Sequence, residues 1–124
     1  MAVVELNKDT FEQTVNENDF VIVDFWAPWC APCRSFAPVY DKVSEDFDNV
    51  VFAKVNTEDE QEIATHFQIR SIPTLMIFRE KIIIFSQAGA LPEQGFRQLV
   101  ERAKELDMDQ VRAQIEEENA KKGA

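Results

Sequence analysis

The sequence predicts an α/β domain in which helices cover both faces of one mixed β-sheet. Apolar runs of strand length alternate along the chain with segments whose apolar residues recur at helical spacing. That alternation is typical of parallel strands joined by helices, whereas the last two apolar runs lie only three residues apart and indicate an antiparallel hairpin. A length of 124 residues with 45% hydrophobic content suits a single domain with its own core.

The first half of the chain contains three expected strands, each followed by an expected helix. Asn7 is a suitable cap for the first helix, in which Phe11 and Val15 share one face. Apolar residues also recur at helical spacing in the second helix and in the third, acidic helix. The expected strands are residues 3–6, 20–26 and 50–55, and the later helices are residues 33–47 and 58–67.

The second half begins with the hairpin, whose strands are expected at residues 74–78 and 82–85. The turn between them, residues 79–81, lacks glycine. Pro92 suits the start of a further helix, which runs to about Leu106 with an apolar stripe on one face. A central sheet of about five strands is therefore expected.

Residues 107–124 are expected to form a C-terminal extension to a domain that spans residues 1–106. Met108, Val111 and Ile115 recur at the spacing of a narrow apolar stripe, so a short extra helix is predicted, followed by a polar tail over residues 116–124. We expect the stripe to pack on the domain. A surface for a partner protein is the alternative.

Charge and composition exclude several classes of function. The formal net charge is −10, which would repel a phosphate backbone, and Lys121-Lys122 follows an acidic run, so no nucleic-acid partner is expected. No stretch approaches the roughly 18 apolar residues of a membrane span, and the N-terminus lacks the basic and apolar regions of a leader. A cytoplasmic protein with no membrane partner is expected, in which a CxxC pair is more often catalytic or metal-binding than structural.

Both cysteines lie in W-A-P-W-C-A-P-C, residues 26–33. This segment leaves a strand at Trp26 and enters the next helix, at the sheet edge where α/β folds place their chemistry. A helix N-terminus stabilises a thiolate, so Cys30 is expected to be the activated residue. Cys33, one turn later, can turn back towards Cys30 under the cover of the domain and suits a resolving role. Pro32 fits the first helical turn, which needs no N–H there.

Two other interpretations of the cysteine pair are weaker. As a structural staple it would close a loop of four residues, which contributes roughly 2 kcal/mol at most. As a metal site it would have only His66 to add to two thiolates, fewer than the usual four ligands, unless a dimer bridged the metal. We therefore expect redox chemistry and no metal, with His66 at the surface.

Three motifs resemble those of the thioredoxin family. They are V-D-F-W-A-x-W-C-x-P-C at residues 23–33, I-P-T at residues 72–74 and G-A-L at residues 89–91. The resemblance covers about residues 3–106 and implies the thioredoxin fold. It also implies a dithiol-disulfide cycle, in which Cys30 attacks a client disulfide and Cys33 releases the reduced client.

The resemblance further implies the partners of the reaction. No bound cofactor is expected, because the redox-active disulfide would be reduced by NADPH indirectly, through a flavoprotein thioredoxin reductase. The three glycines of the chain cannot form a dinucleotide-binding loop. The other expected partners are client proteins that contain disulfides, and the chain is expected to be a monomer.

Asp24 and Lys54 are lone charges within apolar strands, and buried charges need partners. In the family the matching aspartate lies beneath the active site, with the lysine beside it, and helps to remove the proton of the resolving cysteine. This implies that Asp24 is a base with a raised pKa. The alternative is that the two groups only satisfy each other in the core.

The I-P dipeptide at Ile72-Pro73 could simply mark the start of a strand. The resemblance instead implies a cis-proline that faces the cysteines, with the Ile72 backbone pairing with an extended substrate segment. An apolar, mostly uncharged patch around Cys30 would then bind clients, formed by Trp29, Ile72, Pro73, Gly89 and Ala90.

The chain departs from the family pattern at Ala31, where glycine is most common, and at Ser71, where glycine is also common. Ala31 lies inside the loop that also contains Trp26 and Pro32. We expect its methyl group to change the reduction potential by about 30 mV, because it adds no charge. Two functions remain open at this point: a protein-disulfide reductase, and a binding or co-chaperone module in which redox turnover is secondary.

Overall fold

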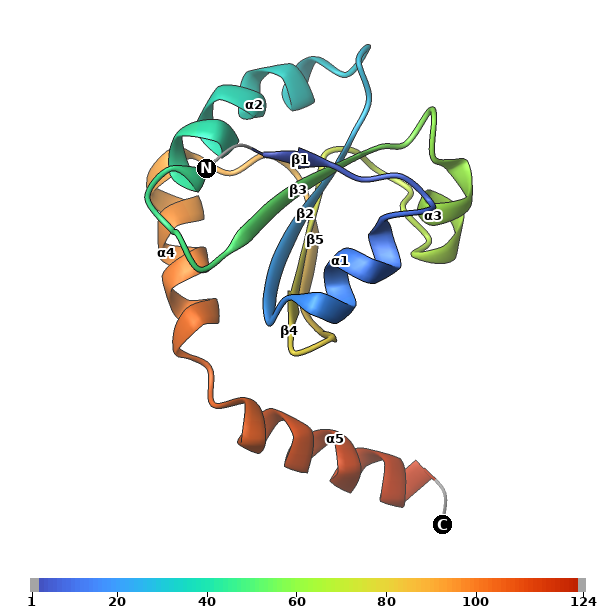
Figure 1. The fold of residues 1–124 in the computed structure, drawn as a ribbon, viewed down its shortest axis with the longest axis vertical. Helices are drawn as coiled ribbons and strands as arrows, with labels where there is room; N and C mark the ends of the chain where they lie inside the picture. The colour runs from blue at the N-terminus through green and yellow to red at the C-terminus, as the bar shows by residue number, and fades with distance from the viewer. Residues whose placement is uncertain (1–2, 123–124) are drawn as a thin grey trace.

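The computed structural model describes residues 3–122, and it confirms the expected mixed five-stranded sheet. The strand order is β1-β3-β2-β4-β5 (Figure 1). Strands β1 and β2 are each parallel to β3, whereas β4 is antiparallel to β2 and to β5. The strands are β1 (Val4–Glu5), β2 (Phe20–Trp26), β3 (Val51–Asn56), β4 (Thr74–Arg79) and β5 (Ile82–Ala88).

Helices cover both faces of this sheet, as expected (Figure 1). The helices are α1 (Phe11–Glu17), α2 (Ala31–Ser44), α3 (Gln61–His66), α4 (Glu93–Glu105) and α5 (Met108–Lys122). Alternate residues of β2 supply two cores: Val21, Val23 and Phe25 pack with α1 and α3, whereas Phe20 and Ile22 pack with α2 and α4. Because both faces of β2 are covered, its sequence is apolar almost throughout. Within residues 3–122 no helix is long and apolar enough to cross a membrane.

The starts of α1 and α2 differ from the expectation, and α3 begins at Gln61, three residues later than expected. Asn7 does not cap α1 directly: its Oδ1 accepts hydrogen bonds from the backbone N–H groups of Asp9 and Thr10, and so stabilises the turn that precedes the helix. Helix α2 begins at Ala31, two residues earlier than expected, because Cys30 occupies the N-cap position. The second difference places both sulfur atoms at the first turn of α2.

The hairpin turn between β4 and β5 is built without glycine. Glu80 and Lys81 both adopt positive φ angles, of 50° and 71°. Two successive left-handed residues match the twist of a two-residue hairpin turn, which usually selects Asn-Gly or Asp-Gly. The Glu80 N–H is bonded to the carbonyl of Asp19 at 2.8 Å, which fixes this turn against the loop before β2.

The C-terminal extension is a helix, as expected, but its apolar stripe packs on the domain only at its start. Met108 is buried, whereas Val111 is half-buried and Ile115 is 37% exposed. Helix α5 leads away from the rest of the molecule (Figure 1), so each turn after Met108 lies farther from the core. Arg112 pairs with Glu80 of the β4–β5 turn and holds the first half of the helix there.

The polar tail expected at residues 116–124 is also helical as far as Lys122, and its last two residues lie outside the described range. Glu, Ala and Lys are strong helix formers, and Glu117 pairs with Lys121 one turn later. The polar residues of this tail suit a helix that solvent surrounds. A segment without apolar residues can therefore still be helical.

Candidate active site

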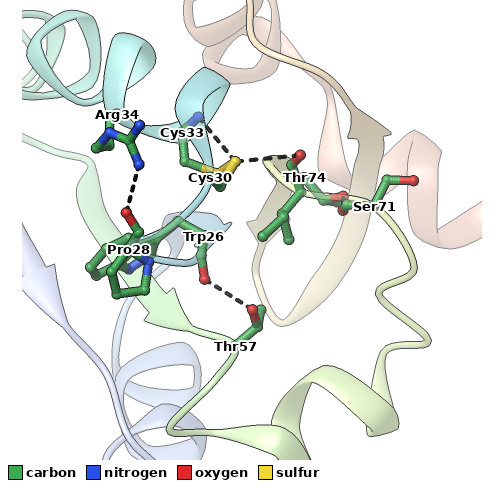
Figure 2. The surroundings of a disulfide bond; sticks show 9 residues. Trp26, Pro28, Cys30, Cys33, Arg34, Thr57, Ser71 and Thr74 are labelled. Atoms are coloured by element: carbon green, nitrogen blue, oxygen red, sulfur yellow. Dashed lines mark hydrogen bonds between the residues drawn. A yellow bond between two sulfur atoms is a disulfide. The ribbon is translucent and has the colours of Figure 1, made fainter.

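The loop from β2 to α2 is held at both ends. At its start, the carbonyl of Trp26 accepts hydrogen bonds from the backbone N–H and the hydroxyl of Thr57, at 2.8 and 3.0 Å. At its end, the guanidinium of Arg34 reaches back from α2 and donates to the carbonyl of Pro28 at 2.9 Å (Figure 2). These contacts fix the position of Cys30 relative to the sheet.

Cys30 and Cys33 form a disulfide, with their Cα atoms 5.2 Å apart. Cys30 is the N-cap residue of α2, and its Sγ accepts a hydrogen bond from the N–H of Cys33 at 3.2 Å (Figure 2). Both cysteines are buried, with exposed fractions of 4% and 2%. Ala31 and Pro32 occupy the first two helical positions and are exposed. The sulfur of Cys30 thus receives an N–H group that would otherwise lack a partner at the helix start.

The segment before β4 faces the disulfide. The Ile72–Pro73 peptide bond is cis, as the resemblance implied, and the carbonyl oxygen of Ile72 lies 3.7 Å from the Sγ of Cys30. The carbonyl of Pro73 accepts a hydrogen bond from the N–H of Gly89 at 2.8 Å. Gly89 has a φ of 109°, which favours glycine. The 72–74 and 89–91 motifs, far apart in sequence, therefore meet at the segment that faces the disulfide.

The expected patch around Cys30 forms only in part as an apolar surface. Trp29 is 64% exposed, but its indole N–H donates to the carboxylate of Glu58 at 2.7 Å, so an acidic group borders the patch. Ile72 is half-buried and packs against the cysteines, whereas Gly89 and Ala90 are exposed. Pro73 is buried.

Three residues of this region were missed in the sequence, namely Arg34, Thr57 and Glu58. Thr57 and Glu58 follow β3, and parallel strands such as β2 and β3 end at the same sheet edge, so their position gave a usable signal. Arg34 directly follows Cys33, but no pattern indicates that its side chain turns back to Pro28.

Asp24 is a buried carboxyl group on the sheet face that α2 covers. It lies two residues after Ile22, which packs against α2, so the two side chains project from the same face. The side chain of Asp24 is fully inaccessible. Neither carboxyl oxygen has a hydrogen-bond partner in the part of the chain that the structure describes. Burial raises the pKa of Asp24 to about 7; Lys54 opposes this rise, and Glu5 adds to it.

Lys54 lies directly opposite Asp24 in the pairing of β2 with β3. Its ammonium group is 4.5 Å from the centre of the Trp26 ring. The two charges therefore share one face of the sheet without a direct hydrogen bond. The two groups interact through their charges, since Lys54 acts to lower the pKa of Asp24, although the described residues offer its oxygen atoms no hydrogen bond.

The described residues contain no group of three or more His, Cys, Asp or Glu side chains arranged to hold a metal ion. His66 is exposed at the end of α3, where its ring lies edge-on to that of Phe67, with the ring centroids 4.8 Å apart. The surface position expected for His66 is confirmed.

Comparison of this sequence with family models and with known proteins points to the same family each time. The family model described as Thioredoxin matches residues 2–102. A Streptomyces coelicolor protein named "Putative thioredoxin 2" is 50% identical over 122 residues, which cover 98% of this chain and 91% of that protein. "Thioredoxin 1" of Nostoc sp. is 41% identical over 103 residues, which cover 82% of this chain and 96% of that protein.

Solved structures agree with the sequence comparisons. A Plasmodium falciparum thioredoxin superposes with a TM-score of 0.76 at 31% identity, covering 81% of this chain and 98% of that one. A thioredoxin mutant from Halobacterium salinarum gives a TM-score of 0.78 at 28% identity, covering 86% of this chain and 94% of that one. The five-stranded fold described above is thus shared with solved thioredoxin structures.

Proposed function

This chain belongs to the thioredoxin family and is a thiol-disulfide oxidoreductase, and we propose that Cys30 is its nucleophile and Cys33 its resolving residue. The observation that carries this assignment is the hydrogen bond from the N–H of Cys33 to the Sγ of Cys30 at the N-cap of α2. In the reduced protein that bond and the positive end of the helix would stabilise a thiolate at Cys30. Cys33 lies inside the helix, and within residues 3–122 its sulfur accepts no such hydrogen bond.

The reaction transfers two electrons from the dithiol to a client disulfide. The Cys30 thiolate attacks one client sulfur, the client disulfide breaks, and the other client sulfur leaves as a thiolate that takes up a proton. Cys33 then loses its proton and attacks the Sγ of Cys30. The mixed disulfide breaks, the second client sulfur leaves, and the Cys30–Cys33 disulfide forms.

Asp24 is the proposed acceptor of the Cys33 proton, with Lys54 as the neighbouring cation. A base works best when its pKa is close to the working pH, and burial raises that of Asp24 to about 7. The unpartnered oxygen atoms of Asp24 are free to accept a proton.

Clients are proposed to bind beside Cys30, over Trp29, Ile72, Pro73, Gly89 and Ala90. The carbonyl of Ile72, 3.7 Å from the Cys30 sulfur, is placed to accept a hydrogen bond from an extended client backbone. Main-chain pairing of this kind depends little on the client's side chains, which suits a reductase that acts on varied proteins.

A flavoprotein thioredoxin reductase that takes electrons from NADPH is the proposed source of reducing equivalents, and the cytoplasm is the proposed compartment. We place the catalytic domain at residues 1–106 and the extension at residues 107–124. The loop between α4 and α5 and the end of the family match at residue 102 support this division.

The test is reduction of insulin coupled to NADPH oxidation with a bacterial thioredoxin reductase. The wild type is expected to sustain turnover, whereas Cys30→Ser removes the attacking thiolate and should reduce the rate to background. Ser35→Ala, which changes an exposed residue of the same helix, is the matched control and should retain the wild-type rate. Equal activity of the wild type and Cys30→Ser would refute the assignment.

A further inference from the structure

Three charged residues form a row across neighbouring strands of the sheet. Glu5 of β1 is paired with Lys54 of β3, and Lys54 is paired with Asp24 of β2. Directly paired residues of adjacent strands project from the same face, so the ammonium group lies between two carboxyl groups. Along this row, Glu5 is exposed, Lys54 is half-buried and Asp24 is fully buried.

The outer end of this row borders a hollow of about 330 Å³ that Glu5, Trp26 and Asn56 help to line. Trp26 is the ring beneath the ammonium group of Lys54. Glu5 is thus in contact with solvent and next to the site of Lys54, whereas Asp24 has no exposed surface. A change of charge at Glu5 therefore acts on Asp24 from the solvent-exposed end of the row, with Lys54 between the two carboxyl groups.

We propose that Glu5 is a positioning residue that sets the protonation of Asp24, and with it the pH dependence of the resolving step, by sharing Lys54. This inference rests on the proposed role of Asp24 as the base. The carboxylate of Glu5 acts in two ways with the same sign. It attracts Lys54 and so weakens the stabilisation of ionised Asp24, and its own negative charge repels that of Asp24.

The other charged and titratable groups near the row are few. Tyr40 of α2 faces Asp24 from the opposite layer, and its hydroxyl lies 2.9 and 2.7 Å from the carbonyls of Ile22 and Ala53. Asp59, after β3, acts on Glu5, and Glu60 lines the same hollow. Leu75 is the apolar partner of Asp24 on β4. Lys54 is therefore the group whose positive charge both carboxyl groups share.

The size of the effect follows from the strand spacing. Two strand steps separate Glu5 from Asp24, so their backbones are about 10 Å apart. One charge at that distance, partly screened by water in the hollow, shifts a pKa by about 0.3 to 1 unit. Glu5→Gln removes the charge and keeps the shape, so the pKa of Asp24 should fall by that amount.

The first measurement is an NMR titration of the Asp24 carboxyl carbon in the oxidised protein, in which the cysteines do not titrate. The midpoint should be lower in Glu5→Gln by about 0.3 to 1 pH unit. It should be largely restored in Glu5→Asp and unchanged in Glu101→Gln, which removes an exposed charge from α4. An identical midpoint in Glu5→Gln and the wild type would overturn the inference.

The second measurement follows the rate at which Cys33 releases a client peptide from a preformed mixed disulfide with Cys30, between pH 5 and 9. Protonated Asp24 cannot accept a proton, so the acid limb of the profile should move to lower pH in Glu5→Gln by the same amount as the titration. An unmoved limb would refute the role of Glu5 in the reaction. If Asp24→Asn kept the wild-type profile, the base assignment itself would fail, whereas the titration would still report on Glu5.

Discussion

The buried carboxyl of Asp24 should make the protein less stable as the pH rises. Its pKa is raised from 3.8 to about 7, mainly because burial disfavours the charged form. Below pH 3.8 the group is protonated in the folded and unfolded states alike, so it contributes no pH dependence. Above pH 3.8, Asp24 ionises in the unfolded chain before it does so in the folded protein, which favours the unfolded state. The resulting loss of folded-state stability is complete only above pH 7.

The magnitude follows from the size of the shift. A rise of about three units corresponds to about 4 kcal/mol at pH 9, and the part already present at pH 5 is about 1.5 kcal/mol. Asp24→Asn removes this penalty and adds a cost that does not depend on pH, since a buried amide would also lack partners. The stability of Asp24→Asn relative to the wild type should therefore increase by about 2.5 kcal/mol from pH 5 to pH 9.

The assay is urea unfolding of the oxidised proteins at both pH values, with the free energy extrapolated to water. Asp48→Asn, which changes an exposed carboxylate, is the control and should show no comparable increase. A constant difference between Asp24→Asn and the wild type at the two pH values would refute the raised pKa.

Three further predictions concern the loop and the extension. Ala31→Gly should shift the reduction potential by about 30 mV, measured by equilibration with glutathione, and a shift several times larger would contradict this expectation. Arg34→Met removes the hydrogen bond to the carbonyl of Pro28 and should lower the free energy of unfolding by about 1 kcal/mol. Arg34→Lys should lower it by less, and equal losses in the two variants would argue against the hydrogen bond. Met108→Ala should lower the free energy of unfolding by about 2 kcal/mol because the side chain is buried. Ile115→Ala should change it by no more than about 0.5 kcal/mol. Similar losses in the two variants would mean that α5 packs along its length.

Periodicity was sufficient to predict the fold because each face of the sheet has its own helices. The run from Phe20 to Trp26 is apolar on both sides, and the strand coincides with it. The same reasoning failed for Ile115, because an apolar residue at the right helical spacing packs only if the helix axis stays close to the domain. That direction depends on the loop at residues 106–107 and on the Arg112–Glu80 pair, which no local pattern indicates.

The residues of the candidate site that belong to short motifs could be predicted from sequence. The contacts that long side chains make around them could not. Cys30 and Cys33 were placed by their position between a strand and a helix, and the structure has them at the first turn of α2. The contacts of Arg34 and Glu58 depend on rotamers of exposed side chains, and those leave no periodic signal in sequence. The role of Glu5 required strand register, which pairs residues 49 positions apart.

The division of roles between Cys30 and Cys33 is tested most directly by trapping the mixed disulfide. Cys33→Ser and Cys30→Ser would each be incubated in reduced form with a disulfide-containing protein, quenched with acid and analysed by intact mass. Cys33→Ser should accumulate a covalent adduct through Cys30, since nothing resolves it, whereas Cys30→Ser should form little or none. An adduct that forms as fast on Cys33 in the Cys30→Ser protein would contradict the claim.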